Sequence, residues 1–309
     1  MGYKQNTKGS TQNAIRLLVT LDQGYVPQLC VLLTSIRMNN PGEAFELYLL
    51  HNQLPDHCCN QIERYCSEFG IAFFPICVDD ALFRDAPASS RYPKEMYYRL
   101  LAPQLLPEHI QRILYLDPDI LVINPLRPLW ELDLCGRLFA AAAHTGKTEL
   151  ANSVNRIRLK TDHDYYNSGV LLMDLEAGRK EISPDELFQY VAEHENELLF
   201  PDQDVLNALY GNHILAIDDV IWNYDARNYN NYLLRSSGVQ NLNWVMENTA
   251  ILHFCGKAKP WKEGYLYRFG GLYRHYMQLT RRIDPREPNF LQNHRMAPEC
   301  GGEGGLQAQ

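Results

Sequence analysis

The sequence predicts an α/β fold in which helices flank a central, mostly parallel β-sheet. From residue 14 onward, short apolar runs with β-branched residues alternate with segments whose apolar residues have helical spacing. Parallel strands need crossover connections, so this alternation of strand and helix is typical of a parallel sheet. The chain has 309 residues, of which 46% are hydrophobic and 21% charged, and this composition is ordinary for a globular protein with a large core.

The first part of the chain supplies three predicted strands with a helix between each pair. Residues 14–21 (AIRLLVTL) form an apolar run that we expect to be a buried strand. A helix is expected over 27–40, because Pro27 suits its first turn and the following apolar residues have helical spacing. The next elements repeat this pattern with a strand at 45–50, a helix at 55–69 and a strand at 71–76.

The rest of the chain adds further strands and two helices with clear starting points. Residues 94–106 predict a helix that Pro103 interrupts. Ser183 is placed to cap a helix that begins at Pro184, and Pro201 begins another helix that reaches about residue 210. Apolar runs predict the remaining strands at 112–117, 119–124, 139–143, 168–175, 213–218 and 250–254.

We expect one main domain over residues 14–262, followed by a helical appendage at 263–287. The tail at 288–309 is rich in Gly, Pro and polar residues, which predicts disorder. Aromatic and Arg residues mix within 263–282, a composition that suits peripheral contact with a membrane surface. An amphipathic helix that packs on the main domain explains the same residues equally well.

The overall charge and the apolar runs exclude several classes of protein. The net charge is -8 and the pI is near 5.7, which argues against a nucleic-acid-binding protein. No run reaches the ~18 apolar residues of a membrane span, and no apolar stretch of signal-peptide length precedes the first predicted strand. We therefore expect a cytoplasmic protein with reduced cysteines, which can still touch the inner face of the membrane.

An acidic pair ends the strand predicted at 112–117. In LYLDPDILV, Asp117 and Asp119 flank Pro118. Two carboxylates this close repel each other unless a cation shares them, and carboxylate oxygens suit Mg²⁺ or Mn²⁺. Ligands of open α/β sheets bind at the carboxyl ends of strands. A polar turn at Pro118 is the structural alternative, and the D-x-D pattern by itself leaves both explanations open.

A second motif, HFCGKAKPW at 253–261, follows the last predicted strand. His253 can complete a carboxylate metal site, because a neutral imidazole is a common metal ligand. Gly256 lets a phosphate approach the backbone closely, and Lys259 supplies a compact positive charge. A capped strand with a surface lysine is the structural alternative.

Two more motifs place polar residues at the ends of predicted core elements. PDQDV begins a helix with Asp202 and Gln203, and YYNSGVLLM puts Asn167 and Ser168 just before a strand. A capping acid and a tight turn would explain them separately. Four such motifs at the ends of core elements favour one common site.

Together these motifs resemble the retaining glycosyltransferases of family 8. That family includes bacterial lipopolysaccharide galactosyl- and glucosyltransferases and, more distantly, glycogenin. The resemblance covers residues 16–261, and the motifs follow the family's order: LVTLDQGYVPQLCVLLTSI, YYRLL, LYLDPDILV, YNSGVLLMDL, PDQDVLN and HFCGKAKPW. It implies that residues 14–262 form a catalytic domain with the GT-A type of nucleotide-sugar-binding fold.

The resemblance also implies a reaction and its partners. The enzyme would transfer glucose or galactose from UDP-glucose or UDP-galactose to a hydroxyl of a glycan or lipid-linked glycan, in lipopolysaccharide or other cell-surface glycan biosynthesis. The family retains the anomeric configuration of the donor and uses a divalent metal, usually Mn²⁺. In this sequence the implied metal ligands are Asp117, Asp119 and His253.

By the same resemblance, residues from several motifs contact the UDP-sugar. Asp22 would accept the uracil N–H and Tyr25 would lie against the base, while Arg99 would reach the donor phosphate or sugar. Gly256 and Lys259 would meet the phosphate oxygens. The other implied contacts are Thr20, Leu21, Asp117, Pro118, Asp119, Asn167, Ser168, Asp202 and Gln203.

The residue expected beside the reacting carbon is Gln203, with Asp202 as the second catalytic candidate. Retention requires either a covalent intermediate on a nucleophile or attack from the face that the leaving group departs from. An amide is a poor nucleophile. We therefore expect same-face attack through an oxocarbenium-like state, with the leaving UDP stabilised by Mn²⁺ and Lys259.

Three features depart from the family pattern on the ribose and acceptor sides. Gly24 stands where some relatives have an asparagine that contacts the ribose. His144 stands where galactosyltransferase relatives have an aspartate near the acceptor. The segment 145–166 is implied to cover the acceptor, and its basic residues suit an acidic glycan or, equally, a solvated loop.

Two other functional classes compete with a glycosyltransferase. A phosphohydrolase of the haloacid dehalogenase type also has D-x-D after a strand, but here Leu121 replaces the expected hydroxyl or Val and no later Gly-Asp motif follows. A non-catalytic binding protein descended from the same fold would be free to lose parts of the site. The full set of acidic, His, Lys and Gln residues speaks against that descendant.

Overall fold

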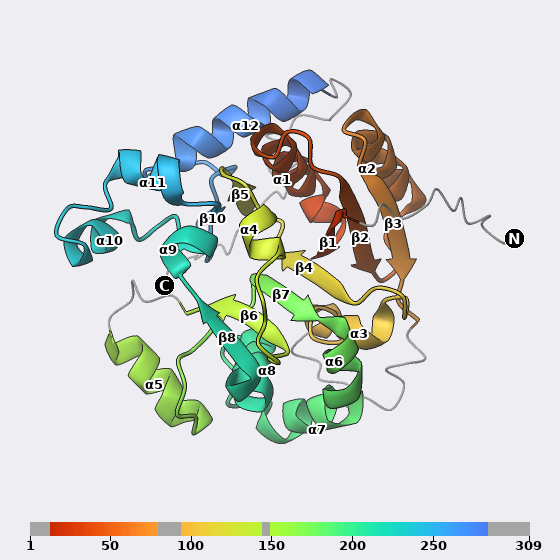
Figure 1. Cartoon of the computed structure of the whole chain (residues 1–309), viewed down its shortest axis with the longest axis vertical. Helices are drawn as coiled ribbons and strands as arrows, with labels where there is room; N and C mark the ends of the chain where they lie inside the picture. The colour runs from red at the N-terminus through yellow and green to blue at the C-terminus, as the bar shows by residue number, and fades with distance from the viewer. Residues whose placement is uncertain (1–12, 80–93, 144–148, 284–309) are drawn as a thin grey trace, which may run out of the picture.

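The computed structural model describes residues 13–79, 94–143 and 149–283, and the side chains of Lys94 and of residues 149–153 are not described. A seven-stranded sheet crosses the molecule in the order β3-β2-β1-β4-β7-β6-β8 (Figure 1). Most neighbouring strands in it are parallel, as the sequence predicts. The strands are β1 (Ile15–Thr20), β2 (Phe45–His51), β3 (Ala72–Cys77), β4 (Arg112–Leu116), β6 (Phe139–Ala142), β7 (Val170–Asp174) and β8 (Ile214–Ile217).

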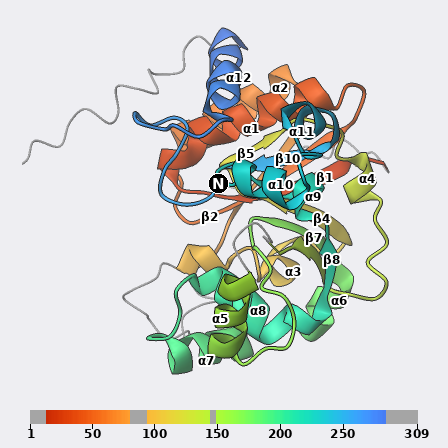
Figure 2. The ribbon, with the colours of Figure 1, turned by 90° about the vertical axis from the view of Figure 1, so that its left-hand side faces the viewer.

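Two helix layers enclose the sheet (Figure 2). On one face lie α1 (Val26–Asn39) and α2 (Asp56–Glu68), and on the other α6 (Leu175–Glu181), α7 (Pro184–His194) and α8 (Pro201–Tyr210). Alternate residues of a strand serve the two faces: Leu17 packs in the core with α1, whereas Leu18 packs in the core with α7 and α8. Ser183 caps α7 as expected, because its Oγ accepts a hydrogen bond of 3.3 Å from the backbone N–H of Glu186.

One strand runs against its neighbours, and this reversal shapes the site. β7 is antiparallel to both β4 and β6, so its beginning lies beside the end of β4. Val170 pairs with Leu116, and the backbone N–H of Asp117 donates to the carbonyl of Gly169 at 2.8 Å. The turn before β7 is therefore next to the acidic pair.

A small second sheet delivers the histidine. It consists of β5 (Ile120–Val122), β10 (Ile251–His253) and β9 (Tyr224–Asp225), with β10 in the middle. His253 is opposite Ile120 on β5 and Asp225 on β9. Since β5 begins directly after Asp119, this pairing brings segments more than a hundred residues apart in sequence together.

The expectation of a helix over 94–106 is wrong. The chain forms a 3₁₀ helix at Lys94–Tyr97, then a turn, then the short α3 at Ala102–Leu105. Pro103 stands in the first turn of α3, where its missing N–H is tolerated, so it begins a helix and does not interrupt one.

Several short helices occur where the sequence analysis made no helix prediction. Within 145–166, α5 spans Glu149–Leu159, while 144–148 lie outside the described residues. The others are α4 (Arg127–Trp130), α6, α9 (Asp219–Trp222), α10 (Tyr229–Arg235), α11 (Leu242–Asn248) and the 3₁₀ turns at Gln23–Tyr25 and Gly211–His213.

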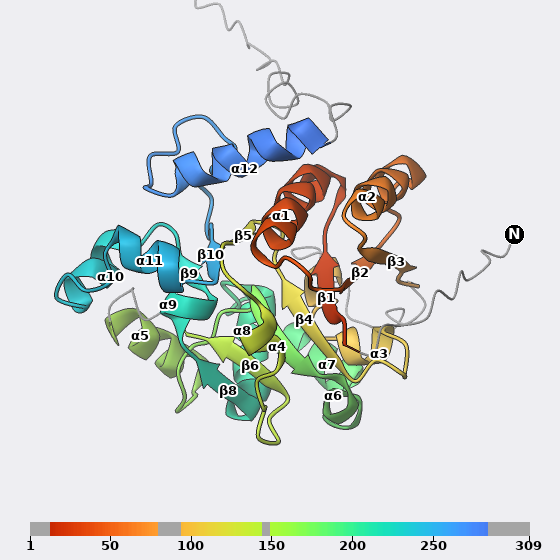
Figure 3. The same ribbon diagram turned by 45° about the horizontal axis from the view of Figure 1, so that its top comes forward.

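The C-terminal helix α12 (Gly270–Ile283) packs against α1 (Figures 1 and 3). Tyr273 is fully buried, and Thr280 joins Thr34 of α1 through hydroxyls 2.9 Å apart. Asn39 of α1 donates to the hydroxyl of Tyr276 at 2.7 Å. Among the described helices, none has the length and apolar character needed to span a membrane. The tail at 288–309 lies outside the described residues.

Candidate active site

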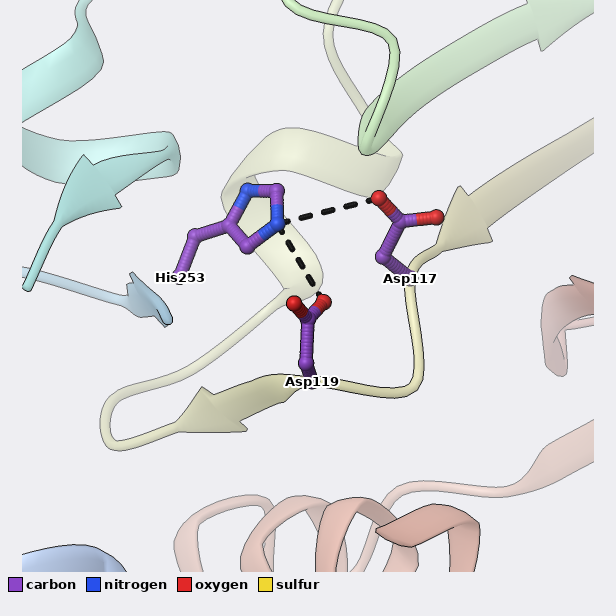
Figure 4. A group of neighbouring side chains, drawn as sticks. All are labelled: Asp117, Asp119 and His253. Carbon is purple, nitrogen blue, oxygen red and sulfur yellow. Dashed lines mark ion pairs between the residues drawn. The ribbon is translucent and has the colours of Figure 1, made fainter. Parts of the chain in front are cut away.

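Three side chains converge at the junction of the two sheets. Asp117 directly follows β4, Asp119 directly precedes β5 and His253 ends β10. Figure 4 shows both carboxylates facing the imidazole. Nε2 of His253 lies 3.3 Å from Oδ1 of Asp119 and 3.7 Å from Oδ2 of Asp117. One ligand atom from each residue lies within 4.8 Å of the other two. We call these residues the Asp–His trio.

The Asp–His trio fits a divalent metal ion. Two carboxylates and an imidazole are ligands that Mn²⁺ and Mg²⁺ sites use, and all three are directed at one point. The space between them depends on Gly169. A Cβ there would lie 2.3 Å from Cε1 of His253 and 2.5 Å from Oδ2 of Asp117. The backbone before β7 thus approaches the trio as closely as only glycine permits.

A series of side-chain amides orients the imidazole. Nδ1 of His253 is 2.9 Å from Oδ1 of Asn223, whose Nδ2 donates to Oδ1 of Asn167 at 2.9 Å. Asn167 in turn donates through Nδ2 to Oε1 of Gln203 at 2.9 Å. Because Asn223 presents its oxygen to Nδ1, that ring nitrogen carries the proton. Nε2 is then the nitrogen that can bind a metal. We call His253, Asn223, Asn167 and Gln203 the amide chain.

Opposite charges hold the acidic side of the trio. Nζ of Lys259 contacts Oδ2 of Asp119 and donates to the carbonyl of Phe254 at 3.0 Å. Burial alone would raise the pKa of Asp119, but His253 and Lys259 hold that pKa well below its usual range. Burial likewise opposes charge on His253, yet Cys255 and Asp119 raise the pKa of the imidazole well above its ordinary value. The trio is thus a place where positive charge is strongly favoured.

Arg99 joins the trio to the residues expected to hold the sugar. Its Nη1 lies 3.0 Å from Oδ1 of Asp117 and 3.2 Å from Oδ2 of Asp202. Its guanidinium also lies over the ring of Tyr115, 4.6 Å from the centroid. Ser168 donates to Asp202 through Oγ at 2.8 Å. Arg99 therefore holds Asp117 and Asp202 together, and Ser168 holds Asp202 in addition.

A cavity of about 500 Å³ opens beside the acidic pair. The trio's carboxylates and Arg99 line it together with the loop after β1 and the end of β2. Its lining residues are Thr20, Leu21, Asp22, Tyr25, Leu50, His51, Asn52, Glu95, Met96, Arg99, Asp117, Pro118 and Asp119. The residues of the loop after β1 and of the acidic pair that were expected at the nucleotide therefore line one cavity.

Other predicted residues lie outside the lining of this cavity. Asp202 and Gln203 occupy the first turn of α8 and join the trio through Arg99 and the amide chain. Gly256 has a φ of +80°, which favours glycine. Within the lining, Asp22 uses Oδ1 to accept from the backbone N–H of Gly24 at 2.7 Å. His144 lies outside the described residues.

Sequence reasoning missed residues that support the site. Asn223 follows a short helix with no recognisable motif, and Tyr115, whose hydroxyl donates to Asp117 at 2.7 Å, appears in the sequence as one more apolar strand residue. Asp204 is fully buried in α8 and accepts from both terminal nitrogens of Arg158, at 2.6 and 2.9 Å. The hydroxyl of Tyr165 donates to the same carboxylate at 2.5 Å. Only the charge of Asp204 within PDQDV could have drawn attention to it.

The chain is similar to known proteins in both sequence and fold. The model of glycosyl transferase family 8 matches residues 16–264. General stress protein A of Bacillus subtilis is 30% identical over 268 residues, which are 84% of this chain and 92% of that protein. The lipopolysaccharide 1,2-glucosyltransferase of Escherichia coli K12 is 25% identical over 268 residues, 84% of this chain and 76% of that one. The solved structure of the galactosyltransferase LgtC with donor and acceptor sugar analogues matches with a TM-score of 0.70 and 22% identity, over 86% of this chain and 96% of that chain.

Proposed function

The chain belongs to glycosyl transferase family 8, and we propose that it moves glucose or galactose from a UDP-sugar to a hydroxyl of a glycan or lipid-linked glycan. It is a glycosyltransferase with the expected GT-A type of α/β fold. The observation that supports the proposal most is the Asp–His trio beside a cavity of about 500 Å³, since this pairs a cation site with room for a nucleotide.

In the proposal, the trio holds Mn²⁺ or Mg²⁺ against the donor diphosphate. The bound cation would neutralise the negative charge that develops on the diphosphate as UDP leaves. Lys259 adds a second positive charge at Asp119, and the positive φ of Gly256 lets its backbone approach a phosphate oxygen. Lys259 and the backbone of Gly256 are held in position by the fold before any sugar departs, and electrostatic catalysis is most effective when its charges and dipoles are preorganised in this way.

The cavity lining supports binding of the uridine part. Asp22 uses Oδ1 to accept the hydrogen bond from Gly24. Its other carboxylate oxygen, Oδ2, can accept the uracil N–H. Tyr25 stands edge-on to Trp261, with ring centroids 6.1 Å apart, and its ring lines the cavity where a base can lie against it. Arg99 is close enough to the trio to reach the donor phosphate or sugar.

The geometry around Gln203 supports transfer from the leaving-group face. Its Oε1 accepts one hydrogen bond from Asn167, and a carbonyl oxygen has a second lone pair for the developing sugar cation. Asp202 is held by Arg99 and Ser168, and Asp204 is enclosed by Arg158 and Tyr165. These engaged carboxylates are poorly suited to act as nucleophiles. In the proposed step the hydroxyl of the acceptor attacks as UDP leaves, and its proton passes to the leaving phosphate.

The proposed acceptor is supported by the name of a relative, and the proposed membrane contact by exposed residues. A relative named for lipopolysaccharide supports a cell-surface glycan as acceptor. Contact with a membrane surface would use Leu266 and Tyr267, which are 93% and 43% exposed, because Tyr273 and Tyr276 are buried against the domain. In the proposal, residues 14–262 form the catalytic domain and residues 263–287 form an appendage to it.

The test is UDP release from UDP-glucose and UDP-galactose with Mn²⁺, with and without a chelator. We expect turnover of at least one donor, loss of turnover on chelation, and loss in the D119N variant. Asp185, exposed on α7, provides a matched control, and D185N should behave like the parent protein. Turnover that ignores metal removal would refute the trio's role. Donor binding without hydrolysis or transfer would favour the non-catalytic alternative, and clear hydrolysis of p-nitrophenyl phosphate would favour the phosphohydrolase.

A further inference from the structure

Arg227 is a rigidly held cation at the end of β9, next to the strand that ends in His253. Its Nε donates to Oδ1 of Asp225 at 2.9 Å and its Nη2 to Oδ2 at 2.7 Å. Asp225 is fully buried and also accepts from the backbone N–H of Arg227 at 3.0 Å and from Nδ2 of Asn228 at 2.7 Å. Since Asp225 pairs with His253 in the small sheet, the guanidinium has a fixed position relative to the trio.

The remaining edge of this guanidinium faces Gly256. A Cβ at Gly256 would lie 2.2 Å from Nη1 of Arg227, so glycine is the residue that leaves room for it. Within the described residues, Nη1 donates to no acceptor, and the side chain is 20% exposed. A partly exposed donor with a full positive charge therefore lies against the backbone where the proposed function places a phosphate.

We propose that Arg227 is an anion-binding residue of the substrate site, with Nη1 donating to a phosphoryl or carboxylate group that lies at Gly256. The inference rests on the proposed function of this site and adds a recognition residue to it. Two sources offer such an anion: the diphosphate of the donor and an acidic substituent of the acceptor. Arginine suits both, because its planar fork keeps one edge on Asp225 while the other meets the ligand.

A purely structural role for Arg227 makes a different prediction. Removing the arginine alone leaves Asp225 buried without its charge partner, which destabilises a fold whatever the site binds. The double variant R227Q/D225N removes both charges together and restores a neutral interior. If Arg227 serves only as a counter-ion, this double variant recovers both stability and ligand binding. If Arg227 binds an anion, stability recovers and binding does not.

The experiment measures the affinity of UDP and of uridine with Mn²⁺ for the parent protein, R227Q and R227Q/D225N. The control is R127Q, since Arg127 is 19% exposed and likewise pairs with an acid, Glu43, while neither residue is among those that line the cavity. We expect both Arg227 variants to bind UDP at least tenfold more weakly, a loss of about 1.4 kcal/mol, with uridine unaffected. The R127Q variant should match the parent protein.

A second arm separates the two sources of the anion. If UDP affinity is unchanged, glucose 6-phosphate and glucose are titrated into the UDP-loaded parent protein and double variant. Loss of a preference for the phosphorylated sugar in the variant assigns the anion to the acceptor. Parent-like UDP affinity together with no lost preference overturns the inference. Failure of the parent protein itself to bind UDP with Mn²⁺ would instead count against the proposed function.

Discussion

Replacing Gly169 with alanine should disable the Asp–His trio while leaving the fold intact. The new Cβ would lie 2.3 Å from Cε1 of His253 and 2.5 Å from Oδ2 of Asp117. Carbon atoms pack at about 3.5–4.0 Å, so the ring and the carboxylate must retreat by about 1 Å. Metal sites tolerate ligand displacements of only about 0.2 Å. The substitution therefore moves two of three ligands well beyond that tolerance.

We expect the G169A variant to bind Mn²⁺ about 10- to 100-fold more weakly, the range seen when ligand orientation is disturbed. The assay is a Mn²⁺ titration of UDP binding by calorimetry, with thermal melting to verify the fold. Gly271 in α12 supplies the control, because a Cβ there meets nothing within 4 Å. G271A should keep the parent Mn²⁺ requirement and a melting temperature close to that of the parent protein. A folded G169A variant with the parent Mn²⁺ requirement would refute the argument.

Three further substitutions or deletions probe the support of the site. N223A should lower Mn²⁺ affinity about 10- to 100-fold, because the imidazole of His253 loses its orienting oxygen; an unchanged Mn²⁺ titration would contradict this. It should also cost about 1–3 kcal/mol in urea unfolding, since Asn223 is fully buried and its hydrogen-bond partners are left unpaired. R158M should cost about 3–5 kcal/mol in urea unfolding, since Asp204 is left buried without its partner, and R158M/D204N should recover much of that loss. Ending the chain at Phe269 should remove at least about 3 kcal/mol of stability, because two buried tyrosines of α12 leave the core; unchanged urea unfolding would show that α12 is dispensable.

Strands were predictable wherever an apolar run was bounded by turn residues. The run at 14–21 becomes Ile15–Thr20, and Ser183 with Pro184 marks the true start of α7. The direction of Val170–Asp174 was not predictable, because a buried strand has the same composition whether it runs parallel or antiparallel to its neighbours. The prediction of one helix over 94–106 was wrong, because helical spacing of apolar residues also occurs where a chain of short turns packs against a core.

The site, like the fold, contains residues that the sequence predicted and residues that it did not. The Asp–His trio follows from motifs at strand ends, where chemistry-bearing residue types stand out against apolar neighbours. Asn223 and Arg227 do not, because each acts through a partner that is distant in sequence: Asn167 for the first and Gly256 for the second. Contacts of this kind become visible only when the small sheet has formed.

The amide chain has a thermodynamic consequence. It connects Gln203, beside the expected sugar, to His253, an expected metal ligand, through three consecutive hydrogen bonds. A sugar bound to the amide of Gln203 and a cation bound to the imidazole would act on the two ends of one series of hydrogen bonds, and the bonds of such a series polarise and strengthen one another. Binding of cation and hexose should then be mutually reinforcing, by the same factor in either order. Under this linkage, if the trio holds a cation, an intact donor would retain it more tightly than UDP alone would, and cleavage of the sugar would weaken cation binding and favour product release.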